Sequence, residues 1–204
     1  MSHLKQFFDD AGGSFGQFSK YYTDYFSELT KVVDVASVEA LVNLLLEARE
    51  RGATIFIIGN GGSASTASHL ALDMRLCTGV NYEPFRALSL ADSASYITAL
   101  GIDDGYENIF VNQLKNLYKT GDVLVAFSAS GNSPNILKTI DYVNSKGGKT
   151  FGLLGFDGGE AKKRCYQSIT VTTPKGEYGP VESLHLLLVH VVSNYLSCRL
   201  IENT

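Results

Sequence analysis

The sequence predicts an α/β fold: a three-layer αβα sandwich with a five-stranded parallel sheet, of the flavodoxin-like or Rossmann-like type, preceded by an N-terminal helical arm. Two observations carry this prediction. From residue 53 onward, short apolar runs alternate with segments of helical periodicity, which is typical of a parallel sheet covered by helices on both faces. The first 50 residues show helical periodicity and contain no strand-like run.

The N-terminal segment carries a stripe of aromatic residues at three- and four-residue steps, the spacing of one helix face. The stripe consists of Phe7, Phe8, Phe15, Phe18, Tyr21, Tyr22, Tyr25 and Phe26. A single α/β domain has little room to bury so many rings, and an exposed patch of this size is unusual in a monomer. We therefore predict that residues 1–34 form a helical oligomerisation arm and that residues 35–204 form one domain.

Apolar runs place the strands of that domain. Strands are expected at residues 53–58, 85–90, 122–127, 149–154 and 168–171. Helices are expected at about 64–76, across 94–118, at 134–146, just after residue 159, and from about 180 to 200. The apolar runs are nearly continuous, as in strands buried on both faces. Right-handed crossovers place the carboxyl ends of such strands on one edge, where ligands bind.

Charge and composition exclude several functional classes. The chain has 17 Lys and Arg against 21 Asp and Glu and no long basic run, so no nucleic-acid partner is expected. No apolar run reaches the ~18 residues needed to span a bilayer, and the N-terminus turns acidic where a secretory signal would be apolar. These features predict a cytoplasmic protein without a membrane partner.

The strand expected at 122–127 leads into a loop rich in hydroxyl groups, Ser128-Ala129-Ser130-Gly131-Asn132-Ser133-Pro134. Pro134 suits the first position of the next helix, and Ser133 suits its N-cap. The free N–H groups and the positive dipole end of that helix would then face the same space as the hydroxyls. The loop predicts a phosphate-binding cradle without Lys or Arg. An ordinary capped loop is the alternative, but it needs one Ser and not three.

The loop after the first strand, Gly59-Asn60-Gly61-Gly62-Ser63-Ala64, fits the glycine pattern of a dinucleotide-binding turn. That pattern expects an acidic residue ~20 positions further on, at the end of the next strand. Asp73 comes too early and Asp92 too late. We therefore expect no nucleotide cofactor, and an NAD-dependent dehydrogenase is the weakest of the alternatives.

Taken together, the two loops resemble the SIS-domain sugar-phosphate isomerase family, and most closely its bacterial phosphoheptose isomerases. Further matching segments are residues 155–159 and the terminal helix with Glu182, His185 and His190. The resemblance covers about residues 35–200, so the second domain is expected to be a SIS domain. It implies an aldose–ketose isomerase that converts sedoheptulose 7-phosphate to D-glycero-heptopyranose 7-phosphate for heptose and lipopolysaccharide synthesis.

The resemblance also implies a set of substrate-binding residues. These are Asn60, Gly61, Gly62, Ser63, Asp92, Ser128, Ala129, Ser130, Ser133 and Glu182. Ser63, Ser128, Ser130 and Ser133 are expected to anchor the phosphate.

The chemistry is expected from His69, Asp73, Glu182 and His190. His69 and Asp73 are four residues apart on a predicted helix, so both reach one point, and Glu182 and His190 share a side of the last helix. Two His and two carboxylates suit a divalent ion, so one Zn²⁺ per site is a candidate cofactor. The alternative is that the same groups move a proton, with Asp73 and His190 as catalytic acid and base.

Two departures from the family pattern bear on function. The family typically has Glu at the position of Asp73 and Gln at that of Glu182. The shorter Asp73 displaces a base or ligand, and Glu182 adds a negative charge. A rival is a non-catalytic SIS-domain sugar-phosphate sensor or replication-initiation adaptor, but the four retained groups favour an enzyme. We also expect a homo-oligomer, most simply a tetramer, in which the two helices at one site come from different chains.

Overall fold

The computed structural model describes residues 2–77 and 83–202. The strands are β1 (Thr54–Gly59), β2 (Arg86–Ser89), β3 (Val123–Ser128), β4 (Lys149–Gly155) and β5 (Gln167–Val171). The helices are α1 (His3–Asp10), α2 (Phe15–Lys31), α3 (Val35–Glu50), α4 (Gly62–Leu76), α5 (Ala94–Asp103), α6 (Val111–Leu117), α7 (Pro134–Ser145), α8 (Gly159–Arg164) and α9 (Tyr178–Glu202), with a short 3₁₀ turn η1 (Tyr106–Asn108). None of the described helices is both long and apolar enough to cross a membrane.

The strands form one parallel sheet in the order β2-β1-β3-β4-β5, which confirms the predicted fold class. From β1 the chain first moves outward to β2 and then returns to the other side of β1 to form β3. The direction of winding therefore reverses between β1 and β3. Ligands bind at this switch point in doubly wound sheets, and the loops after β1 and β3 both leave the sheet there.

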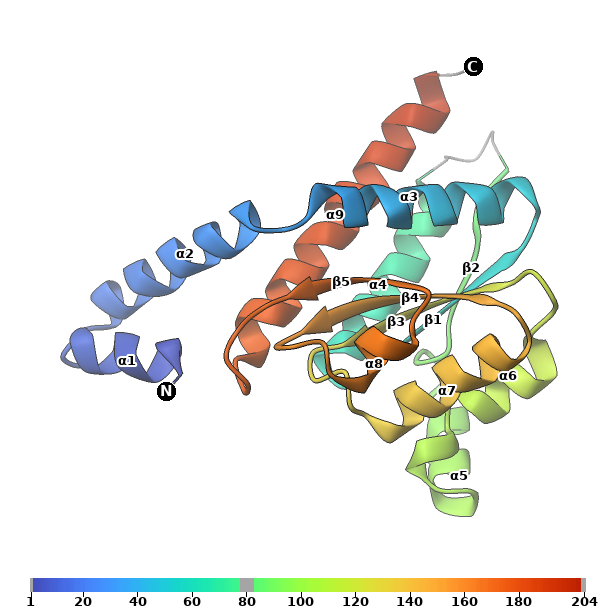
Figure 1. The fold of residues 1–204 in the computed structure, drawn as a ribbon, viewed down its shortest axis with the longest axis horizontal. Coiled ribbons are helices and arrows are strands. Elements are labelled where there is room, and N and C mark those ends of the chain that lie inside the picture. Colours follow the sequence, from blue (N-terminus) through green and yellow to red (C-terminus); the bar gives the residue numbers. More distant parts are fainter. Residues whose placement is uncertain (1, 78–82, 203–204) are drawn as a thin grey trace.

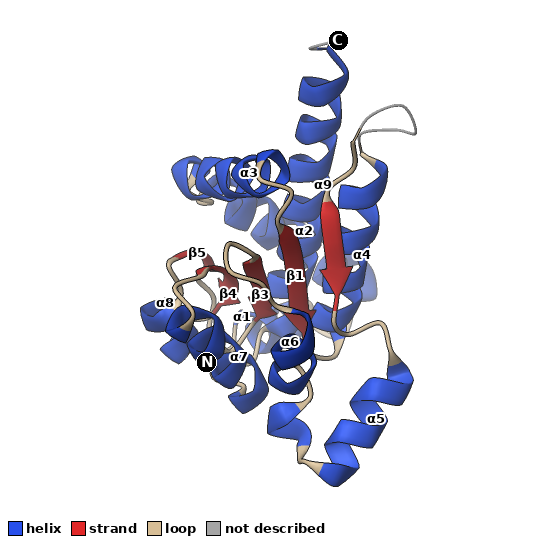
Figure 2. Cartoon of the chain, turned by 90° about the vertical axis from the view of Figure 1, so that its right-hand side faces the viewer, coloured by secondary structure: helices blue, strands red, loops and turns tan. Residues whose placement is uncertain are grey.

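Helices cover both faces of the sheet (Figures 1 and 2). Alternate residues of β1 point to opposite faces: Ile57 belongs to a core with α3, α4 and α9, whereas Phe56 belongs to a core with α6 and α7. All six residues of β3 are buried, as the apolar run predicts. The three-layer sandwich follows from these two cores, and it places α4 and α9 on the same face.

The structure divides the helical region expected across 94–118 into α5, η1 and α6. The helix is interrupted at Gly105, whose φ of +88° is not helical. Glycine suits this position because the conformation is costly for other residues. The break brings η1 toward the edge of the sheet where β1 ends.

The N-terminal helices α1 and α2 form a hairpin that extends to one side of the sandwich (Figure 1). Part of the aromatic stripe packs within this hairpin, since the ring of Phe7 lies 5.6 Å from that of Tyr25 and 6.0 Å from that of Tyr21. Phe8 and Phe15 remain exposed. Leu29 of α2 is buried in a small apolar cluster with α9. The arm is therefore packed on its own chain, and its role in oligomerisation stays a prediction.

Candidate active site

The loops after β1 and β3 and the first turns of α9 enclose a small cavity of about 110 Å³. It is lined by Asn60, Ser63, Phe127, Ser128, Ala129, Ser130, Ser133, Tyr178 and Glu182. We call it the serine pocket. Most of the residues predicted to bind substrate thus meet at the switch point, although two different loops and a distant helix supply them.

The hydroxyl groups of the serine pocket are arranged to donate to a ligand. Ser128 Oγ accepts the N–H of Gly131 at 3.1 Å, and Ser130 Oγ accepts the N–H of Asn132 at 3.3 Å. Each hydroxyl keeps its own hydrogen free, because accepting a hydrogen bond does not use it. The described part of the chain therefore offers the donors that a phosphate requires without a basic side chain.

Ser133 occupies the N-cap position of α7 as expected, with Pro134 directly after it. Among the described residues, its hydroxyl makes no capping bond to the helix, which differs from the usual role of an N-cap serine. Pro134 has no N–H group, and the N–H of Ile136 donates to Asn135 Oδ1 at 3.0 Å. The Ser133 hydroxyl and the N–H of Asn135 are thus the donors left for an anion at the positive end of the helix dipole.

Two glycines allow α4 to begin close to α9. Gly61 has φ of +54°, a conformation that residues with a side chain rarely adopt. At Gly62 a Cβ atom would lie 2.2 Å from Glu182 Oε2, so a side chain there would displace that carboxylate from its position. The glycine-rich loop therefore serves close approach of two helices.

Asn60 is held at the edge of the serine pocket by two side chains that the sequence analysis missed. Asn60 and Asn135 exchange amide hydrogen bonds of 2.9 and 2.8 Å, and Tyr106 Oη donates to Asn60 Oδ1 at 3.2 Å. Asn135 is 1% exposed. A buried amide at the start of a helix needs such a partner, but the sequence gives no signal of which one.

Asp92, also predicted to bind substrate, lies elsewhere. It is exposed, and its carboxylate accepts a hydrogen bond from Ser68 on the flank of α4. In the described chain it does not line the serine pocket. A role for Asp92 in substrate binding stays a prediction.

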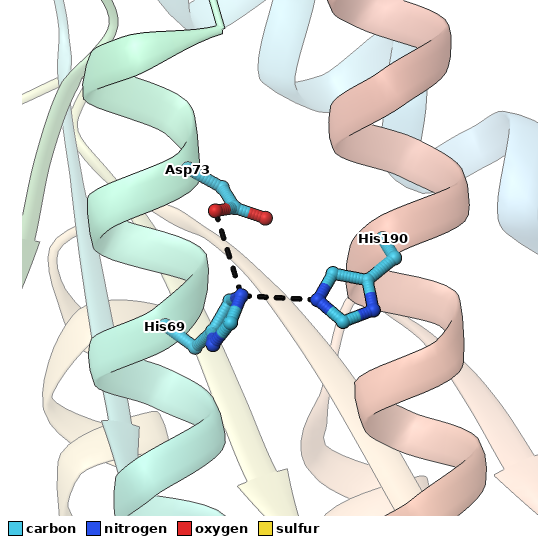
Figure 3. A group of neighbouring side chains, drawn as sticks. All are labelled: His69, Asp73 and His190. Atoms are coloured by element: carbon cyan, nitrogen blue, oxygen red, sulfur yellow. Dashed lines mark hydrogen bonds and ion pairs between the residues drawn. The ribbon is translucent and has the colours of Figure 1, made fainter.

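Further along the same two helices, His69 and Asp73 of α4 face His190 of α9 (Figure 3). The Nε2 atoms of the two histidines are 3.0 Å apart, and Asp73 Oδ1 lies 3.5 Å from His69 Nε2. One ligand atom from each residue lies within 4.8 Å of the others. We call this group the His–Asp–His cluster, and it opens into a cavity of about 340 Å³.

Ser193 of α9 supports the cluster by donating its hydroxyl hydrogen to Asp73 Oδ2 at 2.9 Å. This contact fixes the shorter acidic side chain from the opposite helix. It leaves Asp73 Oδ1 directed at His69. Two imidazoles and a carboxylate with one open side suit a zinc ion, and the same groups suit proton transfer.

His185 also lies on α9 but belongs to the core. It is 1% exposed, and its Nε2 lies 3.1 Å from the carbonyl oxygen of Leu154. Burial lowers its pKa to about 4, so the ring is neutral at physiological pH. His185 therefore serves packing of α9 against β4, although it belongs to the segment that matches the family.

Known proteins resemble this chain in sequence. The model of the SIS domain family matches residues 17–155, more than half of the chain. A phosphoheptose isomerase of Helicobacter pylori (strain Shi470) is 37% identical over 151 residues, which are 74% of this chain and 78% of the relative. One of Trichlorobacter lovleyi is 36% identical over 167 residues, 82% of each chain. The chain belongs to the SIS domain family.

A solved structure supports the same assignment. The phosphoheptose isomerase of Neisseria gonorrhoeae aligns with a TM-score of 0.80 and 26% identity, covering 90% of this chain and 98% of that one. This SIS-domain protein therefore groups with isomerases and is an enzyme of the aldose–ketose isomerase class. The family match begins at residue 17, inside α2, so it includes most of the second helix of the arm.

The four residues that were predicted to carry the chemistry do not all meet in the structure. His69, Asp73 and His190 meet within one chain, because α4 and α9 pack against each other on the same face of the sheet. This grouping is complete within one chain, and whether a second chain also contributes a helix to the site stays a prediction. Glu182 lies in the serine pocket and outside the cluster, ~12 Å along α9 from His190 at 1.5 Å per residue.

Proposed function

We propose that this protein interconverts sedoheptulose 7-phosphate and D-glycero-heptopyranose 7-phosphate, and that it serves heptose synthesis for a surface polysaccharide. The observation that carries the proposal is the arrangement of two sites along α4 and α9. The serine pocket lies at the start of both helices, and the His–Asp–His cluster lies further along both. Ser63 and His69 are ~9 Å apart along α4, so an extended sugar phosphate has room to reach from one site to the other.

In this arrangement the phosphate occupies the serine pocket. The hydroxyls of Ser63, Ser128, Ser130 and Ser133 and the N-terminus of α7 donate to its oxygens. Anchoring one end of the substrate orients the other end at the cluster, which lowers the entropic part of the barrier.

The reaction transfers a proton between C1 and C2 through an enediol. It needs a base for the proton and a group that stabilises the oxyanion. Asp73 and His190 are the acid–base candidates, since both face His69 across the open side of the cluster. Ser193 orients Asp73 by its hydrogen bond to Oδ2.

The donor set also fits one zinc ion, held by His69, Asp73 and His190. Glu182, which was predicted as a further ligand, does not join them in this chain, because it lies in the serine pocket. When bound, such an ion polarises a carbonyl oxygen of the substrate. The two uses of His190 compete, because a base needs the Nε2 lone pair that a ligand would donate to the ion. Removal of metal therefore separates them.

Glu182 stands where the family typically has Gln, so its role in the proposed reaction is specific to this chain. Its carboxylate lies in the serine pocket against Gly62. A negative charge there repels phosphate but accepts hydrogen bonds from sugar hydroxyls. We therefore propose that Glu182 contacts hydroxyl groups of the sugar and tunes which phosphorylated sugar is accepted.

We further propose that the protein is cytoplasmic and assembles as a homotetramer without nucleic-acid or membrane partners. Supporting the assembly is an apolar groove of about 420 Å³ between α3 and α9, with Val35, Val191 and Tyr195 each at least 50% exposed. Light scattering measures the subunit number directly. A monomeric mass with full activity contradicts the assembly.

The experiment that tests the activity offers the protein sedoheptulose 7-phosphate, fructose 6-phosphate and phosphate-free sedoheptulose. We expect conversion of the seven-carbon phosphate, weaker conversion of the six-carbon phosphate and none of the free sugar. A protein that binds these sugars without converting any would instead be a sensor. The assembled His–Asp–His cluster argues against that alternative.

A further inference from the structure

A buried carboxylate, Glu177, lies in the loop immediately before α9. Its side chain is 1% exposed, and its backbone N–H donates to the Pro174 carbonyl oxygen at 3.2 Å. Ionised groups are rarely buried in this way unless several donors surround them. It lines neither the serine pocket nor the cavity of the His–Asp–His cluster in the described chain, so the proposed chemistry does not explain it.

The donors around Glu177 come from the N-terminal arm. Its Oε1 accepts from Ser2 Oγ at 2.8 Å and from the His3 backbone N–H at 2.6 Å, and its Oε2 accepts from Tyr25 Oη at 2.9 Å. His3 Nδ1 lies 3.6 Å from Oε2. One side chain thus joins the start of α1 and the middle of α2 to the loop that begins α9.

The ionised form of Glu177 is the one these contacts favour. Burial by itself raises the pKa of the carboxyl, but the hydrogen bonds from Ser2, Tyr25 and His3 outweigh it, and the net pKa is lowered. Burial and the bond to Glu177 raise the pKa of Tyr25, which therefore stays a hydrogen-bond donor. The contact is a charged acceptor with a complete set of donors.

The residue after Glu177 reaches the substrate pocket. Tyr178 is the first residue of α9 and lines the serine pocket, and Glu182 follows one turn later. The ring of Tyr178 packs edge-on against Phe156 at 5.1 Å. Phe156 has φ of +55°, a strained conformation for a non-glycine residue. The first turn of α9 thus forms one wall of the pocket and packs on this loop.

The arm contacts this turn at a second place. Tyr22 Oη would lie 3.2 Å from a Cβ at Gly179, so α2 passes directly beside α9 there. Leu29 of α2 belongs to the same buried cluster as Ala129 of the serine loop and Val181 of α9. The arm therefore borders two of the three elements that form the serine pocket, the loop after β3 and the start of α9.

We infer that Glu177 is a positioning residue: by joining the N-terminal arm to the start of α9, it holds Tyr178 and Glu182 in place at the substrate pocket. The inference rests on the proposed function of that pocket. The free N–H groups of a helix start favour fraying unless partners restrain them. Without the carboxylate, the donors of Ser2, His3 and Tyr25 lose their common acceptor, and the start of α9 loses its hydrogen-bonded link to the arm.

Kinetics of Glu177→Ala and Tyr25→Phe test the inference. We expect Glu177→Ala to raise KM for the active sugar phosphate about tenfold, with kcat changed less than about threefold, because the cluster itself is untouched. Tyr25→Phe removes one of the bonds and should raise KM less. Glu177→Gln keeps an acceptor oxygen and should lie between them.

Two control variants separate positioning from loss of stability. Glu28→Gln removes an exposed glutamate of α2 that pairs with Lys31, and it should leave KM unchanged. Leu41→Ala opens the core beneath α3 and should lower the melting temperature without raising KM. A KM for Glu177→Ala within about twofold of wild type overturns the inference.

Hydrogen exchange gives a readout that does not require activity. In Glu177→Ala, peptides covering residues 1–31 and 176–184 should lose protection together, while the peptide covering α7 keeps it. Retained protection at 176–184 contradicts the link, whatever the substrate. If the wild type converts no sugar phosphate, the proposed function fails, and the exchange data still decide whether Glu177 holds the start of α9.

Discussion

The Nε2 atoms of His69 and His190 lie 3.0 Å apart, although 121 residues separate them in the sequence. The contact exists because α4 and α9 pack on the same face of the sheet and bring the same sides of both helices together. Asp73, one turn after His69, completes the group (Figure 3). A site assembled within one chain has consequences that differ from those of a site shared between chains.

The first prediction concerns the origin of the cluster. Asp73→Ala and His190→Ala should each be inactive, and a mixture of the two proteins after subunit exchange should stay inactive, because each site lacks one residue from its own chain. The measurement is activity after mixed refolding. Restored activity would show that the residues are shared between chains.

The second prediction concerns Ser133. Because its hydroxyl makes no capping bond in the described structure, Ser133→Ala should leave the melting temperature unchanged and raise KM for the sugar phosphate. Ser128→Ala combined with Ser130→Ala should raise KM more than tenfold, since a charge-assisted hydrogen bond contributes ~1.5–3 kcal/mol.

Ser93 provides the matched control for Ser133. Its hydroxyl accepts the N–H of Tyr96 and caps α5. Ser93→Ala should therefore lower stability by ~1 kcal/mol without changing KM. If Ser133→Ala behaves like this control, the hydroxyl serves the helix and not the phosphate.

The third prediction concerns metal. The purified protein should contain, or be activated by, about one divalent ion per His–Asp–His cluster. His69→Ala should lose the ion in elemental analysis, whereas Cys77→Ser, a change beside the cluster cavity, should retain it. Full activity after exhaustive chelation, with no ion detected, would leave acid–base roles alone.

The fourth prediction concerns the pH dependence of folding. Burial lowers the pKa of His185 from 6.5 to about 4, so the unfolded chain binds a proton between these values that the folded chain does not. The contribution of neutral His185 to the free energy of unfolding is therefore fully present above pH 6.5, and it decreases as the pH falls toward 4. Between pH 7 and pH 5 the expected loss is about 2 kcal/mol.

Urea unfolding at the two pH values measures this loss. His185→Gln should be less stable at pH 7 but should show a smaller difference between pH 7 and pH 5. An equal pH dependence in variant and wild type would mean that other groups dominate.

The sequence predicted the elements that local pattern determines. The continuous apolar runs located all five described strands, and the hydroxyl-rich loop located the serine pocket, because both signals are contained in a few consecutive residues. The parallel order then fixed the edge at which these loops meet.

The features that the sequence left open depend on packing between distant segments. Whether His190 meets His69 in the same chain depends on which face of the sheet each helix covers. Likewise, the pairing of Asn135 with Asn60 and the link from Glu177 to Tyr25 join residues 75 and 152 positions apart. Periodicity shows that a residue is buried, but it does not identify its partner.

We propose that the His–Asp–His cluster moves a proton on a sugar whose phosphate lies in the serine pocket. Deuterium incorporation at C1 of sedoheptulose 7-phosphate in deuterated water tests it most directly. We predict rapid incorporation with the wild-type protein, slow incorporation with Ser128→Ala/Ser130→Ala at low substrate concentration, and none with His190→Ala. Wild-type protein that binds the sugar phosphate without exchanging deuterium, or His190→Ala that exchanges as fast as wild type, would contradict the claim.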